Sequence, residues 1–244
     1  MKKDKRLIVA LDIDKKEKAL HLVDMLSPEV AVFKVGLELF SSCGPDIVAD
    51  IRKRGCEVFL DLKFHDIPNT AGRAAASVTG LGAFMFNVHA LGGFEMMQRA
   101  AKDTRHKAET LEIPRPKILA VTMLTSMDRD ALKRIGIEGN VEAQVLKLAK
   151  LAHEAGLDGV VASPKEAFAI RRELGKDFII VTPGIRPSGA ADQGASDDQK
   201  RIATPKDALS AGADYIVVGR PITEAADPLK AAREILKEII VAHL

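Results

Sequence analysis

Residues 58–70 read Val58-Phe59-Leu60-Asp61-Leu62-Lys63-Phe64-His65-Asp66-Ile67-Pro68-Asn69-Thr70. An apolar run of strand type carries an acid and an amine two residues apart, and a proline and a threonine then indicate the start of a helix. Because side chains at i and i+2 of a strand point the same way, we expect Asp61 and Lys63 to lie side by side. Asp66 follows the expected strand end, in a loop from which its side chain can reach elsewhere. What the protein does depends on where these charges face.

Similar apolar runs occur along the whole chain. Strands are expected at Leu7–Ile13, Val30–Leu37, Val58–Phe64, Ala83–His89, Lys117–Leu124, Gly159–Ala162, Phe178–Thr182 and Tyr215–Val218. Helices are expected between and after them at Asp14–Met25, Pro45–Arg54, Asn69–Leu81, Gly93–Arg105, Arg129–Arg134, Val141–Ala155, Pro164–Leu174, Thr204–Ser210 and Asp227–His243. Continuous apolar strands that alternate with helices are typical of a parallel sheet buried on both faces. Eight such units in 244 residues, without a break in composition, favour an α/β fold with one domain over residues 1–244, a single (β/α)8 TIM barrel, over an open doubly wound sheet.

The composition argues against several classes of protein. The chain is 47% hydrophobic and 29% charged, and its formal net charge of +2 lacks the basic excess of a nucleic-acid-binding protein. Cys43 and Cys56 form no C-x-x-C pair, and two cysteines do not make a disulfide framework. The sequence contains no apolar signal-peptide region and no apolar run of about 18 residues. We therefore predict a cytoplasmic protein that binds neither nucleic acid nor membrane.

Polar residues fall at the expected carboxyl ends of the strands, where barrel enzymes build their active sites. They are Asp12, Lys34, Asp61, Lys63, His89, Thr125, Ser163, Pro183 to Arg186, and Gly219-Arg220. We expect Ser163 to be a helix N-cap and His89 to be a packing histidine. His65 points opposite to its neighbours, so we expect it in solvent or in subunit packing. Solvated helix faces are expected for Arg99, Arg105, Arg171 and Arg172.

Lys34 interrupts an apolar strand and must have a partner there to stay charged. The nearest candidates are Asp12 and Asp61, at the ends of the two neighbouring strands. Strand order alone therefore predicts an inward network of Asp12, Lys34, Asp61 and Lys63. We interpret this network as a functional site, with a purely structural ion network as the alternative.

The surroundings of Lys63 narrow its chemistry. Carboxylates such as Asp61 and Asp66 favour the ammonium form of a nearby lysine. A lysine that forms a Schiff base must instead lose its proton easily. We therefore expect Lys63 to be a proton donor, which suits the quenching of a carbanion. Asp61 could repel the carboxylate of a substrate.

A phosphate site is expected at the other end of this cluster. Gly219-Arg220 follows the eighth strand, where barrel enzymes commonly hold phosphate, and arginine offers a planar fork of donors. The loop from Pro183 to Gln199 carries Arg186, Gln193 and Gln199, and we expect it to close over that phosphate.

Residues 60–70 closely resemble the signature of the orotidine 5′-monophosphate decarboxylase family, and the D-x-K-x-x-D-I-P-N-T string is highly specific. Further motifs of this family, each modest alone, occur in the right order: Val9-Ala10-Leu11-Asp12, Phe33-Lys34-Val35-Gly36, Leu124-Thr125-Ser126, Val181 to Pro187, Asp198-Gln199-Lys200-Arg201, Thr204-Pro205 and Val218-Gly219-Arg220-Pro221. The resemblance implies a carboxy-lyase that converts orotidine 5′-monophosphate to uridine 5′-monophosphate, the last step of de novo pyrimidine synthesis.

The resemblance also implies roles for individual residues. Lys63 would deliver a proton to C6 of the pyrimidine after carbon dioxide leaves, Asp61 would stress the carboxylate, and Lys34 would hold the charges and contact the ribose. The other substrate-binding residues implied are Asp12 at a ribose hydroxyl, Thr125 at the pyrimidine, Arg186, Gln199, Gly219 and Arg220 at the phosphate, and Pro183. The implied reaction needs neither a metal nor an organic cofactor.

A shared site is implied as well. Asp66, with Ile67 and Thr70, would reach into the active site of a partner subunit, so the enzyme would be an obligate homodimer. The loop between Arg186 and Gln199 is a few residues longer than the family pattern, so Gln193 competes for the phosphate role. The adjoining Lys-Arg-Ile-x-Thr-Pro string favours Gln199.

Three other functions remain open from the sequence. A sister decarboxylase or synthase that acts on sugar phosphates would share the acid–lysine–acid core but need Mg²⁺. A Schiff-base aldolase is suggested only by a lysine in a barrel, and a non-catalytic binder of a phosphate ligand could keep the same fold. The intact Ile67-Pro68-Asn69-Thr70 string favours the nucleotide enzyme.

Overall fold

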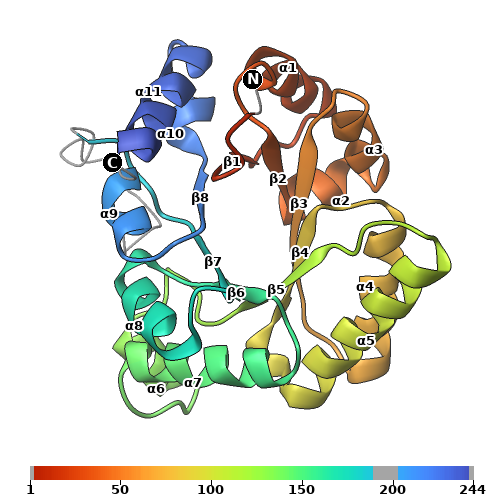
Figure 1. Ribbon diagram of the computed structural model, residues 1–244, viewed down its shortest axis with the longest axis vertical. Coiled ribbons are helices and arrows are strands. Elements are labelled where there is room, and N and C mark those ends of the chain that lie inside the picture. Colours follow the sequence, from red (N-terminus) through yellow and green to blue (C-terminus); the bar gives the residue numbers. More distant parts are fainter. Residues whose placement is uncertain (1–2, 189–202, 242–244) are drawn as a thin grey trace.

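The computed structural model describes residues 3–188 and 203–241. In this part of the chain, eight parallel strands close into a barrel in the order β1 to β8 (Figure 1). The strands are β1 (Leu7–Leu11), β2 (Val32–Gly36), β3 (Glu57–Phe64), β4 (Met85–His89), β5 (Lys117–Val121), β6 (Gly159–Val161), β7 (Ile179–Thr182) and β8 (Tyr215–Val218). Pairing of β1 with β8 closes the circle, so the predicted barrel is confirmed and the open sheet is excluded.

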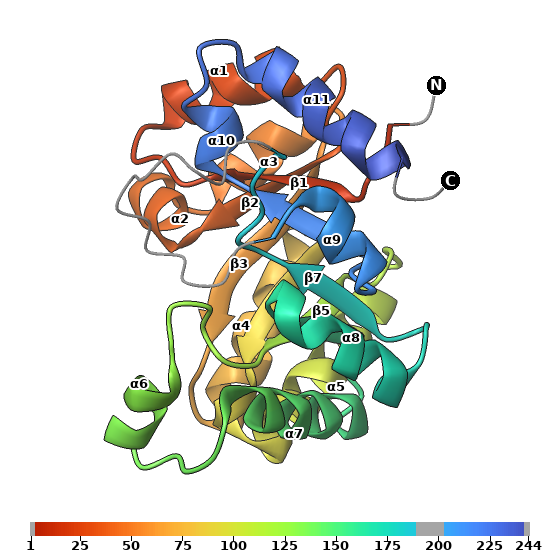
Figure 2. The same ribbon diagram turned by 90° about the vertical axis from the view of Figure 1, so that its left-hand side faces the viewer.

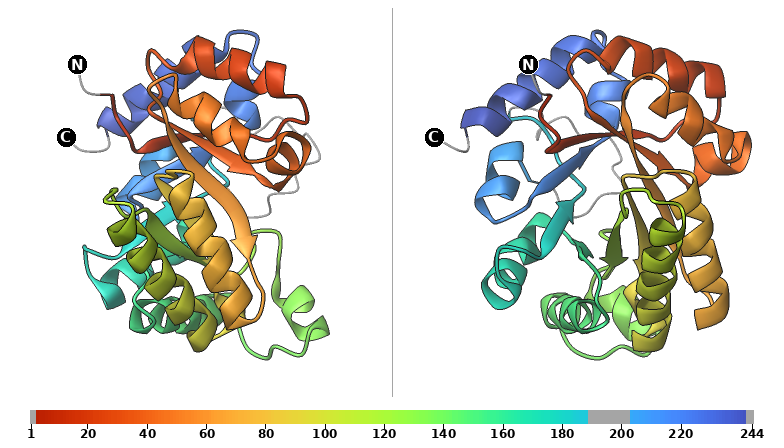
Figure 3. Two further views of the ribbon diagram at one scale, coloured as in Figure 1. Left: turned by 90° about the vertical axis from the view of Figure 1, so that its right-hand side faces the viewer. Right: turned by 45° about the vertical axis from the view of Figure 1, so that its right-hand side comes forward.

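Helices surround the barrel, and α4 and α5 lie side by side outside β3 and β4 (Figures 1 and 3). The helices are α1 (Lys16–Leu26), α2 (Leu37–Cys43), α3 (Asp46–Arg52), α4 (Pro68–Gly80), the 3₁₀ turn η1 (Ala90–Gly92), α5 (Phe94–Thr110), α6 (Arg129–Arg134), α7 (Val141–Glu154), α8 (Pro164–Leu174), α9 (Pro205–Ser210), α10 (Arg220–Thr223) and α11 (Pro228–Val241). Figure 2 shows α6 standing out from the barrel after β5. Among the described residues, no helix combines the length and the apolar character needed to span a bilayer.

Two short helices, α2 and α10, were not expected from the sequence. Each has at most seven residues, too few for helical periodicity to show in a window of about 11 residues. The expected strand at Val30–Leu37 therefore ends one residue too late, because Leu37 already begins α2. In the opposite sense, α5 runs to Thr110, beyond the expected end at Arg105.

Apolar side chains pack in two layers that follow the alternation of the strands. In β1, Ile8 and Ala10 belong to the cluster inside the barrel, whereas Leu7, Val9 and Leu11 pack outward against the helices. Phe59, Met85 and Leu119 fill the same interior cluster. The barrel interior is thus a packed core, and the polar groups lie above it, beyond the carboxyl ends of the strands.

Arg171 corrects one expectation. It does not lie on a solvated face of α8, because its guanidinium donates to the carbonyl oxygens of Gly175, Phe178 and Gly212 at 2.7–3.2 Å. It also donates to Asp214 at 2.6 Å. Arg171 therefore connects α8 to the two segments that lead into β7 and β8.

Candidate active site

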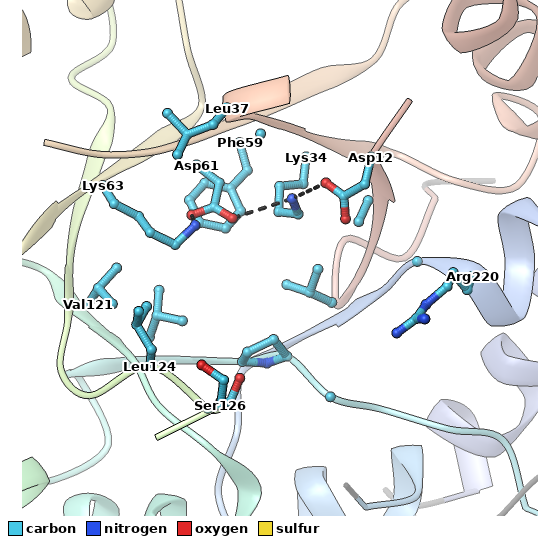
Figure 4. A pocket seen from close by; sticks show the side chains of 18 of the residues that line it. Asp12, Lys34, Leu37, Phe59, Asp61, Lys63, Val121, Leu124, Ser126 and Arg220 are labelled. Atoms are coloured by element: carbon cyan, nitrogen blue, oxygen red, sulfur yellow. Dashed lines mark hydrogen bonds and ion pairs between the residues drawn. The ribbon is translucent and has the colours of Figure 1, made fainter. Parts of the chain in front are cut away.

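Four charged side chains form a row along one wall of the mouth of the barrel (Figure 4). Lys34 Nζ lies 2.8 Å from Asp12 Oδ1 and 3.3 Å from Asp61 Oδ2. Asp61 Oδ1 in turn accepts a hydrogen bond from Lys63 Nζ at 2.7 Å. The predicted inward network of Asp12, Lys34, Asp61 and Lys63 is therefore present, with charges that alternate in sign.

Strand register produces this row. Lys34 pairs with Ala10 on one side and with Phe59 on the other, and Gly36 pairs with Asp61. A Cβ atom on Gly36 would lie 3.0 Å from Lys34 Nζ and 3.1 Å from Asp12 Oδ1. The glycine therefore leaves the space in which this lysine and this carboxylate meet.

Lys34 and Asp61 are the two central charges of the row, and because they are largely removed from water each depends on the other to stay ionised. Lys34 is 8% exposed. Burial lowers the pKa of Lys34, but the negative charges of Asp61 and Asp12 and their hydrogen bonds outweigh it and raise the pKa overall. Burial likewise raises the pKa of Asp61, and Lys34, Lys63 and a hydrogen bond from Asn87 reverse the effect and lower it. Both groups are therefore charged at neutral pH.

The row borders a cavity of about 580 Å³. Thr125, Pro183, Arg186, Gly219 and Arg220 also line it, as the sequence predicted for a common site. In the view of Figure 4, Arg220 lies beyond the Asp12 end of the row, and Leu124 and Ser126 face the row from the opposite side. The cavity thus offers a charged wall, an apolar and hydroxyl-bearing wall, and Arg220 at one end.

Three predicted site residues lie outside the lining of this cavity. Asp66, Ile67 and Thr70 are exposed, and Asp66 Oδ1 accepts from the backbone N–H of Ile67 at 2.7 Å. Among the described residues, the ion pairs and hydrogen bonds of the row join Asp12, Lys34, Asp61, Lys63 and Asn87, and they do not include these three residues. Gln199 and its competitor Gln193 lie outside the described residues.

The remaining polar residues at the strand ends have structural surroundings. Ser163 caps α8 in a capping box with Glu166, as expected. His65 and His89 stack with ring centroids 5.4 Å apart, and His89 Nδ1 accepts from the N–H of Leu91. Burial, with His65 and Lys63 nearby, lowers the pKa of His89 from 6.5 to about 4. His89 is therefore neutral at physiological pH.

Comparison with known proteins decides the family. The family model described as orotidine 5′-phosphate decarboxylase / HUMPS family matches residues 5–235. The chain belongs to this family. A curated relative from Moorella thermoacetica, named orotidine 5′-phosphate decarboxylase, is 55% identical over 238 residues, which cover 97% of this chain and 92% of the relative. A relative of the same name from Trichlorobacter lovleyi is 54% identical over 235 residues, 96% of this chain and 95% of the relative.

Solved structures of the orotidine 5′-phosphate decarboxylase / HUMPS family have the same fold. The crystal structure of orotidine 5′-phosphate decarboxylase from Lactobacillus acidophilus superposes with a TM-score of 0.83 at 40% identity, over 97% of this chain and 99% of that one. The enzyme of that name from Pyrococcus horikoshii gives a TM-score of 0.75 at 28% identity, over 96% of this chain and 99% of that one. These matches confirm the resemblance inferred from residues 60–70 and the assignment to a carboxy-lyase family.

Sequence reasoning missed Asn87, whose side chain bonds both Asp61 and the backbone of Lys63. Its Nδ2 donates to Asp61 Oδ1 at 2.6 Å, and its Oδ1 accepts from the backbone N–H of Lys63 at 2.8 Å. The signal was available, because Asn87 interrupts the apolar run of Phe86 and Val88 as Lys34 interrupts its own strand. Over residues 3–188 and 203–241, no group of three or more His, Cys, Asp or Glu side chains is arranged to hold a metal ion.

Proposed function

We propose that this protein decarboxylates orotidine 5′-monophosphate to uridine 5′-monophosphate, with residues 1–244 acting as one catalytic domain. The bond between C6 of the pyrimidine and its carboxylate breaks, carbon dioxide leaves, and the electron pair stays on C6. The ammonium group of Lys63 then gives its proton to C6 and later regains a proton from water. The reaction is the last step of de novo pyrimidine synthesis, which fits the predicted cytoplasmic location.

One observation carries this proposal: a largely buried carboxylate held between two ammonium groups at the edge of a nucleotide-sized cavity. Asp61 lies 2.7 Å from the Lys63 ammonium and 3.3 Å from that of Lys34. A substrate carboxylate placed next to Asp61 meets a fixed negative charge, and its loss relieves that repulsion. The carbanion that forms then faces the Lys63 ammonium. Charges fixed before the substrate arrives stabilise a transition state without reorganising during the step.

Binding energy comes from the rest of the nucleotide. Arg220 and Arg186, which both line the cavity, provide planar donor forks for a phosphate dianion. Asp12 takes a ribose hydroxyl, and Thr125 and Pro183 border the pyrimidine. Binding of the phosphate far from C6 holds the carboxylate against Asp61, and such remote binding energy can offset the cost of the repulsion. Gln199 completes the phosphate site in this proposal.

The active unit in this proposal is a homodimer. Asp66 and Thr70, together with Ile67, enter the site of the other subunit and add a second carboxylate beside its Lys63. The support for this arrangement is the exposure of all three residues, because Ile67 is an aliphatic side chain that is 67% exposed.

A spectrophotometric assay with orotidine 5′-monophosphate tests the proposed function. We expect loss of substrate absorbance at an undiminished rate in EDTA. Lys63→Ala should lower kcat by about 10²-fold to 10⁴-fold or more, the usual range for removal of a general acid, while uridine 5′-monophosphate still binds. Lys53→Ala serves as the matched control, because the Lys53 side chain is 76% exposed and does not line the cavity, so its loss should leave turnover unchanged.

The other candidate functions give different outcomes in the same experiments. A requirement for Mg²⁺ would favour the sugar-phosphate enzyme. Trapping of a substrate adduct on Lys63 by borohydride would favour an aldolase. Binding of the nucleotide without turnover in the unmodified protein would favour the non-catalytic binder.

A further inference from the structure

Strand β3 contains an irregularity at the position of the proton donor. Leu60 pairs with Phe86 of β4, and the next recorded pair is Phe64 with Val88. The chain of β3 therefore advances four residues while β4 advances two. Lys63 lies inside this interval and has a φ angle of 51°. A left-handed conformation costs an ordinary residue about 1–2 kcal/mol, so something in the surroundings must hold it.

Asn87 is the β4 residue opposite this interval, and it is fully buried. Its Oδ1 accepts from the Lys63 N–H at 2.8 Å, and its Nδ2 donates to Asp61 Oδ1 at 2.6 Å. The two partners dictate how the amide is oriented, because a backbone N–H can only donate and a carboxylate can only accept. A short side chain with both a donor and an acceptor is needed here, and asparagine provides both.

These two bonds act on the charged row without touching the cavity. Asn87 is absent from the lining of the cavity, whereas Asp61 and Lys63 border it. One bond holds the backbone from which the Lys63 side chain extends, and the other holds Asp61 on the oxygen that also accepts from Lys63 Nζ. A change at Asn87 should therefore shift the proton donor and the carboxylate relative to the substrate while the groups that bind the substrate stay in place.

We propose that Asn87 is a positioning residue for the decarboxylation, which orients the Lys63 ammonium and the Asp61 carboxylate by bridging the irregular section of β3. This inference rests on the proposed function, because it concerns the orientation of the Lys63 ammonium group toward C6 of the substrate. Two groups held by one rigid amide keep their mutual geometry throughout the reaction.

Two variants distinguish the bond that Asn87 makes to the Lys63 N–H from the bond that it makes to Asp61. Asn87→Leu removes both at similar volume. Asn87→Asp has the same shape and still accepts from the Lys63 N–H, but it places a second carboxylate against Asp61. We expect kcat to fall about 10-fold to 100-fold in both variants, as for a small misplacement of a catalytic group. KM and the Kd of uridine 5′-monophosphate should change by less than about three-fold, since the lost interaction acts after binding.

The pH dependence of kcat/KM distinguishes a positioning role from a purely structural one. If Asn87 only stabilised the fold, this pH dependence would be the same in the folded variants. The hydrogen bond from Asn87 favours the ionised form of Asp61, so its removal should raise the pKa of that carboxyl group. The acid limb of kcat/KM should therefore move to higher pH in Asn87→Leu, and further in Asn87→Asp, where two carboxyl groups compete for one proton.

Thr79→Val is the matched control. Thr79 is as buried as Asn87, and its hydroxyl donates to the carbonyl of Ala75 within α4 at 2.8 Å, away from the row. We expect this variant to lose some thermal stability but to keep the kcat and the pH profile of the unmodified enzyme. If Asn87→Leu fails to fold, the isosteric Asn87→Asp supplies the comparison.

Folded Asn87 variants with unmodified kcat and pH profile would overturn the proposal, as would a rise in KM alone. An unmodified protein without turnover would instead refute the proposed function. The crystal structure of an Asn87 variant then tests the positioning by itself. We expect the φ angle of Lys63 to leave the left-handed region or its Nζ to part from Asp61, and an unchanged Lys63 would count against the role.

Discussion

Lys34 shows at the scale of one residue how a buried charge is retained. Its side chain is 10% exposed, and the loss of water would by itself favour the neutral amine. Two carboxylates at 2.8 Å and 3.3 Å reverse that preference and raise its pKa. The arrangement is reciprocal, because the same lysine lowers the pKa of Asp61. Lys34 and Asp61 therefore each favour the charged form of the other.

Lys34→Met should therefore lower the free energy of unfolding by about 3 kcal/mol or more, because it leaves Asp61 buried with one cation fewer. The pH dependence gives a second check. Since the pKa of Lys34 is raised in the folded state, its contribution is fully present below the unfolded value of 10.5 and is lost as the pH rises through the folded value. Urea denaturation between pH 7 and pH 11 should show this loss in the unmodified protein and not in the variant.

Lys53→Met is the control for that experiment. Lys53 is 76% exposed and lies 3.7 Å from Asp50, so its loss should change the stability by less than about 0.5 kcal/mol. Equal stability losses in the two variants would show that Asp61 does not depend on the charge of Lys34.

For His89 we predict that folding stability is lost as the pH falls, whereas the contribution of Lys34 is lost as the pH rises. Unfolded, His89 binds a proton below its ordinary pKa of 6.5, but folded only below about 4. The unfolded chain therefore binds more protons in this window, and the folding stability falls as the pH decreases from 6.5 towards 4. We expect His89→Asn to flatten that slope in urea denaturation at pH 7, 5.5 and 4.5. His21→Asn, on the exposed surface of α1, should keep the slope, and a titration of His89 near 6.5 by NMR would refute the prediction.

At the scale of elements, Arg171 holds three segments together at the amino-terminal end of the barrel. Its donors reach the carbonyl that ends α8, the carbonyl before β7 and the turn before β8. Asp214 completes this group, since its Oδ2 accepts both from Arg171 and from the N–H of Ile180 in β7. These contacts of Arg171 lie at the end of the barrel opposite the site. A change there should affect the stability of the fold without affecting catalysis.

Arg171→Ala should lower the free energy of unfolding by about 1–3 kcal/mol, since it removes the donor to three carbonyl groups and one of the two donors to Asp214 Oδ2. Arg171→Lys should recover only part of it, because an ammonium cannot span the same four acceptors. Arg172→Ala, the exposed neighbour on the same helix, should be nearly neutral. KM for the substrate should stay unchanged in all three variants, and a loss of activity in folded Arg171→Ala would contradict this separation.

The elements that the sequence could predict are those whose signals are local. Tyr215–Val218 and Pro164–Leu174 match the structure at both ends, because an apolar run and a capped helix are legible within one segment. Lys34 was found because burial demands a partner and neighbouring strands offered two. Arg171 could not be found in this way, since its partners lie in loops of separate segments. The left-handed Lys63 arises from a mismatch between two strands, which no single strand displays.

At the scale of the whole molecule, one face at the carboxyl end of the barrel carries several large exposed apolar side chains. Leu37, Ile67, Leu91 and Phe94 are 37–67% exposed and follow the neighbouring strands β2, β3 and β4. Asp66 and Thr70 lie in the same region, outside the cavity of their own chain. An isologous dimer through this face would cover the apolar side chains and would place two copies of Asp66 symmetrically.

Mixing two inactive variants tests that arrangement. A dimer of Lys63→Ala with Asp66→Ala contains one site with an intact lysine and an intact partner carboxylate, and one site that lacks both. Random exchange makes half of the dimers mixed, so about a quarter of all sites should be intact and the activity should return to about a quarter of the unmodified value. Lys63→Ala mixed with the double variant Lys63→Ala, Asp66→Ala forms no intact site and should stay inactive. Absence of rescue, with subunit exchange confirmed by native mass spectrometry, would show that Asp66 serves its own chain or none, because a shared site must regain function when its two halves meet.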